Sequence, residues 1–563
     1  MIACSSALRT FRNIAGFCAV ASSQQEFSRL LRPCIKGTRR FFSSPGHMEV
    51  VEGEADKTMI REGKAVLAAG VATDKVFYNP VQEFNRDLSC LVLSAFLDRF
   101  KIRLEEKQAK KQARRAENGN PNSEFPPFRA RVLDAMAATG LRSCRYALQS
   151  PLVAEVVAND SDETACQAIR LNAEANNCAD KVIVTHQDAR RLMINSGFDE
   201  QWFHAVDLDP FGSASPFVEG ALQCVADGGL LMATCTDTAI LCGNFAEACY
   251  ARYGATAVRN PAHHEISLRI VLYYLANRAM HHNKNIEPLI SVREGHYVRV
   301  FLAVHRGAQE AKQVVMKASY MKNCTVCHNI QLQPICEPHK TAFYNASLSG
   351  GSTCDICGTV MKIGGPIWNA NIHDNAFVTI LLSNLDKDSS QYGTKDLLRG
   401  KLTMIQEELP DQPFYIQSKD IFKVVHCLPI PSRNFFSALH HAGYKYSPTH
   451  CELDSIKTNA PFDVVWDIIR CWVKQNPIAE NRRSEPKIAR ILGPEPKIQA
   501  NFTLHPDADF GSRKNKMLRF PTAGVKGPMA RPKRLPWERS PPSTEDDTDA
   551  EVKKAKLDGN NGA

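Results

Sequence analysis

The chain has 563 residues, 44% of them hydrophobic and 23% charged, which leaves room for two or more domains and a sizeable core. No apolar run approaches the roughly 20 residues that a membrane-spanning helix needs, and the longest, residues 266–276, contains Arg269 and is typical of a buried helix. The net charge is +9, but residues 1–42 hold seven Lys or Arg against one acid, so any nucleic-acid binding would depend on local basic patches.

The first 48 residues are predicted to be a targeting segment rather than part of a folded domain. They are rich in Arg and Ser and end in Arg39-Arg40-Phe41-Phe42-Ser43-Ser44. This composition is typical of a mitochondrial presequence, with cleavage expected after Phe42. A disordered basic leader without a targeting role is the alternative.

A strand that leads into a glycine turn is predicted at residues 131–143. Val132 and Leu133 end a short buried strand, and a helix is expected from about Ser143. Small residues and Gly140 between them would let the backbone approach a ligand closely. The spacing is not GxGxxG, so the turn does not indicate a nicotinamide cofactor.

Two further strands are predicted to end in acids. The strand at 155–159 ends in Asp160, about twenty residues after the glycine turn, where an acid typically accepts the ribose hydroxyls of a nucleoside cofactor. The strand at 181–186 leads to Asp188 and Ala189, whose carboxylate and backbone N–H suit an adenine ring. For either acid alone, capping of the following helix is the simpler interpretation.

A fourth strand, at 203–206, leads to Asp209-Pro210-Phe211. The carboxylate and the Pro210 carbonyl can accept the N–H groups of an exocyclic amine, and the ring can stack on its heterocycle. A tight turn would explain the same residues. Because open α/β sheets bind ligands at the carboxyl ends of their strands, the four strand ends together predict S-adenosyl-L-methionine (SAM) beside a nucleic-acid base.

Seven short motifs between residues 51 and 501 carry a family resemblance. They are Arg61-Glu-Gly, Phe77-Tyr78-Asn79-Pro80, Asn85-Arg86-Asp87, Ala138-Thr139-Gly140-Leu141-Arg142-Ser143, the segment from Asp207 to Gly212, Thr236-Asp237-Thr238 and Gly364-Gly365-Pro366. Together they closely resemble the tRNA (guanine-26 N2)-dimethyltransferase family.

The resemblance implies a class I methyltransferase that methylates the N2 atom of one tRNA guanine twice. The cofactor-binding positions that it implies are Arg61, Arg142, Asp160, Asp188 and Ala189. Asp209 falls at the catalytic position, with Pro210 and Phe211 as its partners on the base. The residues before the glycine turn would fold back over the site as a cap.

Two CxxC knuckles, Cys324/Cys327 and Cys354/Cys357, are separated by 26 residues. This pattern predicts a structural Zn²⁺ site with four cysteine ligands. His328, Cys336 and His339 lie between the knuckles and could compete as ligands, and four buried thiols without metal is the simpler alternative. The remaining cysteines are scattered, often in apolar runs, which argues against a disulfide framework.

The predicted fold class is α/β. A class I (Rossmann-like) methyltransferase domain with an N-terminal cap is expected at 49–310, a Cys4 zinc segment at 311–365, and a C-terminal α/β domain that orients tRNA at 366–500. In this last domain we expect a strand at 421–430 and helices at 434–441 and 462–473. Residues 501–563 read as a basic, low-complexity tail, and both termini are expected to be disordered.

The expected partner is the tRNA substrate, with neither a membrane nor an obligate protein partner indicated. Basic clusters at 531–534 and 553–556 resemble nuclear import signals, so we expect the protein in mitochondrion and nucleus, with the cytoplasm left open. Three alternatives remain. They are a paralogue that modifies a neighbouring tRNA guanine, a methyltransferase that acts on the exocyclic amine of DNA adenine or rRNA guanine, and a catalytically silent tRNA-binding protein.

Overall fold

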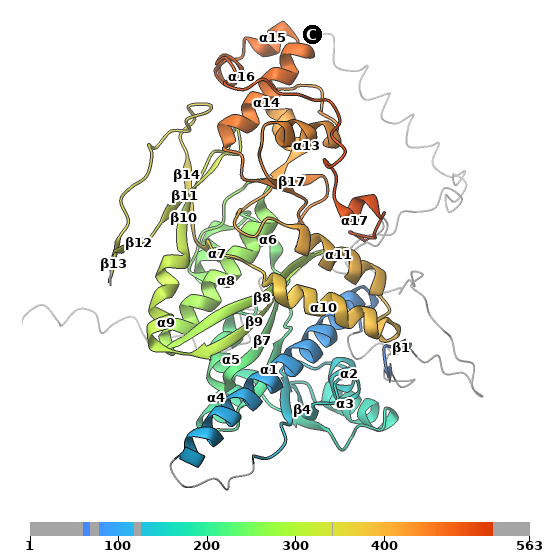
Figure 1. Cartoon of the computed structure of the whole chain (residues 1–563). Helices are drawn as coiled ribbons and strands as arrows, with labels where there is room; N and C mark the ends of the chain where they lie inside the picture. Colours follow the sequence, from blue (N-terminus) through green and yellow to red (C-terminus); the bar gives the residue numbers. More distant parts are fainter. Residues whose placement is uncertain (1–59, 68–77, 118–124, 340–341, 522–563) are drawn as a thin grey trace, which may run out of the picture. The chain divides into compact units, whose positions relative to one another are not determined.

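The computed structural model describes residues 60–67, 78–117, 125–339 and 342–521 (Figure 1). The predicted presequence, Phe77 and both predicted import clusters lie outside these residues. Within them, no helix is both long enough and apolar enough to span a bilayer.

A seven-stranded sheet with strand order β5-β4-β3-β6-β7-β9-β8 forms the centre of the fold. Its strands are β3 (Ala130–Asp134), β4 (Val153–Asp160), β5 (Val182–His186), β6 (Phe203–Leu208), β7 (Val225–Cys235), β8 (Lys284–Glu294) and β9 (Tyr297–Arg306). The strands β3 to β7 run parallel, whereas β9 runs antiparallel to both β7 and β8. The strand order reverses between β3 and β6, and an open α/β sheet binds its ligand at such a point. The predicted α/β fold class is confirmed.

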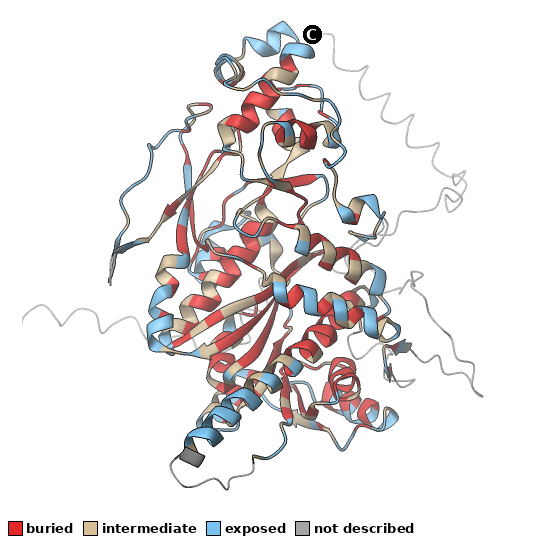
Figure 2. Ribbon diagram, in the orientation of Figure 1, coloured by how far each residue is buried: buried red, intermediate tan, exposed pale blue. Residues whose placement is uncertain are grey.

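Alternate side chains of the strands enter two separate hydrophobic clusters, one on each face of the sheet. Val132 and Ala205 belong to one cluster, and their neighbours Leu133 and Val206 belong to the other. This alternation is the two-residue period of a strand buried on both faces. Figure 2 shows the resulting buried layer between the helices.

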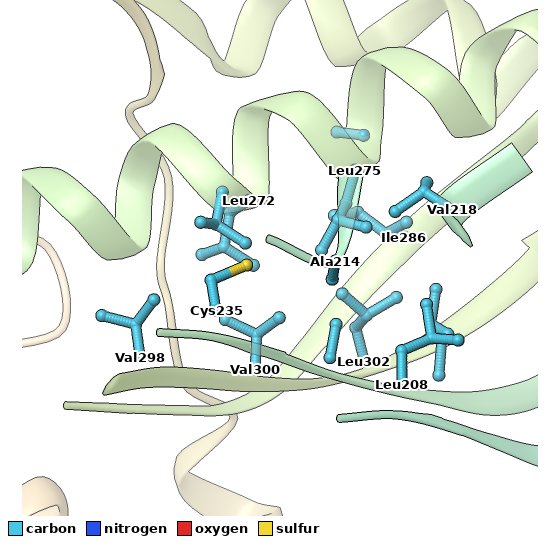
Figure 3. Packing of buried hydrophobic residues seen from close by; sticks show 14 of the residues in the cluster. Leu208, Ala214, Val218, Cys235, Leu272, Leu275, Ile286, Val298, Val300 and Leu302 are labelled. Atoms are coloured by element: carbon cyan, nitrogen blue, oxygen red, sulfur yellow. The ribbon is translucent and has the colours of Figure 1, made fainter. Parts of the chain in front are cut away.

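Helices cover both faces. One face packs against α1 (Glu83–Glu117), α2 (Leu141–Gln149), α3 (Glu163–Ala175), α10 (Asn375–Lys387) and α11 (Lys395–Glu407). The other packs against α4 (Ala189–Phe198), α5 (Val218–Cys224) and α8 (His263–His281). Figure 3 shows Leu272 and Leu275 of α8 beside Val300 and Leu302 of β9.

The two knuckles lie beside a small antiparallel sheet of β10 (Ala318–Asn323), β11 (Ile330–Pro334) and β14 (Lys362–Trp368). Their four cysteines pack in one cluster with helices from the C-terminal part of the chain: α12 (Ser418–Val424), α13 (Ser432–His441) and α14 (Phe462–Gln475). A short sheet of β15 (Ile416–Gln417), β17 (Ser455–Thr458) and β16 (Tyr446–Ser447) accompanies them.

The predicted helices at 434–441 and 462–473 are confirmed, but the predicted strand at 421–430 is wrong. Residues 418–424 form α12, and 425–431 have no regular structure. Ile421, Phe422 and Val425 are buried, and their spacing places them on one face of a helical turn. Two prolines at 429 and 431 remove backbone donors that a strand would need.

Candidate active site

The carboxyl ends of β3, β4 and β6 open into one cleft of about 860 Å³. Of the residues predicted to act on cofactor or base, Arg142, Asp160, Asp209, Pro210 and Phe211 line it. The N-terminal block also reaches the cleft and contributes the lining residues Tyr78, Asn79, Gln82 and Arg86. The structure therefore brings the predicted base-binding triplet and part of the predicted cofactor site into one cavity.

The glycine turn is held by Asp160. One carboxylate oxygen accepts a hydrogen bond from the Ala138 amide (2.9 Å) and the other accepts one from the Asp162 amide (3.0 Å). Gly140 has a φ of 73°, and a β-carbon there would lie 2.9 Å from Ile169, so both conformation and space require glycine.

Three predicted cofactor residues do not line the cleft. Asp188 caps α4, accepting hydrogen bonds from the amides of Arg190 (2.8 Å) and Arg191 (3.4 Å), and its hydrogen bonds with the Arg190 side chain lower its pKa to about 2. Ala189 is the first residue of that helix. Arg61 is exposed in β1 (Ile60–Glu62), which pairs with β2 (Ala65–Leu67). Their cofactor roles remain predictions.

Arg142 connects two carboxylates at the end of β6. Its guanidinium donates to Asp209 and to Oδ2 of Asp207 (3.0 Å). Asp207 is completely buried and also accepts from Arg299 (2.9 Å) and from the Tyr146 hydroxyl (2.6 Å). Burial raises the pKa of Asp207, but the charges of Arg299 and Arg142 outweigh it and hold the pKa below its usual value.

Asp134, at the end of β3, also lines the cleft. Burial, and then the negative charge of Asp207, raise its pKa to about 7. Its Oδ2 atom accepts a hydrogen bond from the Ser143 hydroxyl (2.7 Å). The cleft thus holds a carboxyl group that is partly protonated at neutral pH near the ionised, Arg-bound carboxylate of Asp207.

The loop after Asp209 is fastened to the Thr-Asp-Thr motif. The Gly212 amide donates to the Thr236 hydroxyl (2.8 Å), and the Thr236 amide donates to the Gly212 carbonyl (2.8 Å). Phe211 lines the cleft with 80% of its surface exposed. An exposed ring on a loop held at both ends offers a stacking surface for a flat heterocycle.

The four knuckle cysteines are buried, and their sulfur atoms lie within 4.8 Å of one another. The Sγ atoms of Cys324 and Cys357 are 3.3 Å apart, and those of Cys327 and Cys354 are 3.4 Å apart. These separations are too long for a disulfide and close to the ~3.8 Å expected between thiolates on one tetrahedral zinc ion. The site could therefore hold zinc, and neither His328 nor Cys336 belongs to the cluster. The side chain of His339 lies outside the described part of the chain.

Comparison with known proteins identifies the family. The family model described as "N2,N2-dimethylguanosine tRNA methyltransferase" matches residues 54–470. The chain belongs to this family. It is 39% identical to the tRNA (guanine(26)-N(2))-dimethyltransferase of Drosophila melanogaster, over 84% of this chain and 86% of that protein. It is 37% identical to the human enzyme of the same name, over 83% of this chain and 76% of that protein.

A solved structure agrees with the family assignment. The fold is similar to that of Trm1 from Pyrococcus horikoshii in complex with SAM, with a TM-score of 0.59 and 27% identity. The similarity covers 72% of this chain and 98% of the archaeal chain. Family membership and this fold support SAM as the methyl donor of the chain.

In this member of the tRNA methyltransferase family, removal of the Cys4 ligands should cost stability. The variant Cys324→Ser/Cys357→Ser is expected to lose one zinc ion per chain and to melt at least about 4 °C lower. Metal analysis and thermal unfolding check this. Cys471→Ser, which changes a cysteine outside the site, should retain the zinc and the melting temperature.

The sequence-based prediction missed three residues that interact with Asp207, two positions before Asp209. They are Asp134, Tyr146 and Arg299. Arg299 carried a recognisable signal, because it interrupts the apolar run at 297–304, where a strand buried on both faces should have none. A charged residue in such a run indicates a buried partner of opposite charge, here Asp207.

Proposed function

We propose that the protein transfers two methyl groups in succession from SAM to the exocyclic N2 atom of guanine 26 in tRNA. The observation that carries this proposal is the placement of Asp209, Pro210 and Phe211 at the same cleft as the Asp160-braced glycine turn. The names of the fly and human relatives supply the position of the guanine.

The residues at the end of β6 suit an aromatic amine. SAM, when bound, supplies an activated methyl group on a sulfonium. The Asp209 carboxylate, oriented by Arg142, accepts a hydrogen bond from one N–H of the amine. This bond localises the lone pair of the amine nitrogen, which is otherwise delocalised into the ring. The carboxylate then takes up the proton as positive charge develops on the nitrogen. The Pro210 carbonyl accepts the second N–H, and Phe211 stacks on the base. Alignment of nucleophile and methyl group supplies much of the rate.

The second transfer requires space for an amine that already carries a methyl group. We infer that the small residues after Phe211 leave this space, because a β-carbon built on Gly212, the neighbour of the cleft-lining Phe211, would meet no atom within 4 Å. The target base must also leave its stack in the tRNA, at a cost of about a few kcal/mol. Stacking on Phe211, 80% of whose surface is exposed, would offset part of that cost.

The cofactor roles of Arg61, Arg142, Asp160, Asp188 and Ala189 remain part of the proposal and rest on the family resemblance. Asp160 and Arg142 line the cleft, which supports their proposed roles in cofactor binding. For Asp188 to receive an adenine amino group, its carboxylate would have to share or exchange its bonds to Arg190.

The predicted domain boundaries and locations also belong to the proposal. The segment 366–500 would orient the tRNA, although its helices α10 and α11 also cover the methyltransferase sheet. Action in the mitochondrion is supported by a Saccharomyces cerevisiae relative, 29% identical over 92% of this chain, whose name includes "mitochondrial". Action in the nucleus rests on the basic clusters at 531–534 and 553–556.

Nucleoside mass spectrometry tests the activity. Full-length protein and SAM are incubated with a tRNA transcript that carries G26 and with a matched G26→A transcript. We expect N2,N2-dimethylguanosine only in the first. Methylation that survives G26→A would favour a paralogue that acts at a neighbouring guanine, and bound but unmethylated tRNA would favour a silent tRNA-binding protein.

A further inference from the structure

Apart from the four knuckle cysteines, the described part of the chain holds two groups of three side chains whose ligand atoms lie within 4.8 Å of one another. One of them, His373 with Glu408 and His450, is not a metal site. The Ser291 amide donates to Nδ1 of His373 (3.2 Å), so Nε2 carries the ring hydrogen and cannot coordinate. The Lys457 ammonium lies 2.9 Å from Glu408 and already supplies the cation.

The other group is Cys242, His263 and His264. Cys242 directly follows the short helix α6 (Thr238–Leu241), and the two histidines are the first residues of α8. Their ring centroids are 4.1 Å apart, and all three side chains are partly accessible. One thiol and two imidazoles form a donor set that Zn²⁺ prefers.

The outer partners of the two rings leave ligand nitrogens available. Nδ1 of His263 lies 3.0 Å from the carbonyl oxygen of Asn260, an acceptor, so Nδ1 carries the hydrogen and Nε2 keeps its lone pair. Nδ1 of His264 lies 3.0 Å from a carboxylate oxygen of Glu452, a charge contact that lacks hydrogen-bond geometry. Ligand histidines in zinc sites usually face a carbonyl or a carboxylate in this way.

The charges around the group are compatible with a bound cation. The positive charge of Arg293 is felt by Cys242, His264 and Glu452, and it opposes the binding of a cation. The Glu452 carboxylate and the thiolate that Cys242 becomes on binding metal offset that charge. The thiol lies 3.4 Å from the Ser267 hydroxyl, which itself donates to the His263 carbonyl (2.7 Å).

We propose that Cys242, His263 and His264 bind a second Zn²⁺ ion, whose fourth position is taken by water. Tetrahedral zinc needs ligand atoms about 3.3–3.8 Å apart. The ligand atoms of the group now lie within 4.8 Å of one another, so small side-chain rotations suffice to bring them to that separation. Binding joins the Cys242 thiolate and two imidazole nitrogens to the metal and releases the thiol proton to water.

The site would tie the base-binding loop to its surroundings. Thr236, which holds Gly212, lies two residues before α6, and the metal would join the end of α6 to α8. Through Glu452 it would also reach the segment between β16 and β17. A second zinc would therefore stiffen the support of Phe211 without touching the base.

Zinc content per chain tests the proposal. Full-length protein is equilibrated with Zn²⁺, freed of excess and analysed by mass spectrometry for metal. We expect two zinc ions per chain in the wild type and one in Cys242→Ala and in His264→Gln. Matched controls are Cys471→Ala and His282→Gln, whose ring faces Glu219 at 2.7 Å much as His264 faces Glu452. Both controls should hold two.

A second measurement separates this site from the Cys4 site. In Cys324→Ser/Cys357→Ser protein loaded with Co²⁺, the thiolate-to-cobalt absorption that remains should disappear on addition of Cys242→Ala. One zinc per wild-type chain after loading, or two zinc ions in Cys242→Ala, would overturn the proposal.

Discussion

Asp209→Ala is expected to lower the rate of methyl transfer by at least about 10²–10⁴-fold while leaving the fold and SAM binding near normal. In the proposed reaction the Asp209 side chain accepts the amine N–H, and it is 23% exposed at the cleft. Arg142 keeps its bond to Asp207 when Asp209 is truncated, so the change does not leave an unpaired buried cation. Single-turnover transfer from labelled SAM and calorimetric SAM binding measure the two properties separately.

The variant Asp209→Asn separates the two proposed roles of this carboxylate, acceptance of a hydrogen bond and uptake of a proton. Asparagine keeps one acceptor oxygen but cannot take up a proton, so we expect a loss between that of alanine and none. Asp199→Ala, an exposed acid at the end of α4, serves as control and should retain wild-type turnover. Turnover in Asp209→Ala comparable to the wild type would contradict the assignment.

Asp207→Ala is expected to have the largest effect on stability, about 3–5 kcal/mol. The carboxylate is fully buried between Arg142 and Arg299, and its removal leaves two guanidinium groups in the interior with reduced compensation. Urea unfolding measures the change. As control, Asp386→Ala breaks an exposed pair with Arg399 and should cost no more than about 1 kcal/mol. Equal effects of the two substitutions would contradict the buried network.

The pH dependence of this effect has a definite sign. The pKa of Asp207 is lowered in the folded protein, so its contribution to the free energy of unfolding is present above the unfolded pKa of about 3.9 and is lost as the pH falls through the folded value. Asp134, with a pKa raised to about 7, acts oppositely, and its contribution declines as the pH rises from about 3.9 towards 7. The difference between wild type and Asp207→Ala should therefore shrink in acid.

Local sequence patterns predicted the strand ends well. The glycine turn, Asp160 and the Asp209-Pro210-Phe211 triplet meet in one cleft. Strands that alternate with helices along the chain imply a parallel sheet, and the carboxyl ends of parallel strands share one edge. The pattern failed at 421–430, where a short apolar run fitted strand and helix equally well and helical packing decided.

The sequence by itself determined the residue types at each strand end and the spacing of the two knuckles, because both are set by neighbours along the chain. Only the tertiary structure decided that Arg142 binds two carboxylates, that Arg299 reaches Asp207 across 92 positions, and that Glu452 faces His264. Such contacts join segments far apart in the sequence. They depend on how strands and helices pack, and local patterns carry little information about that packing.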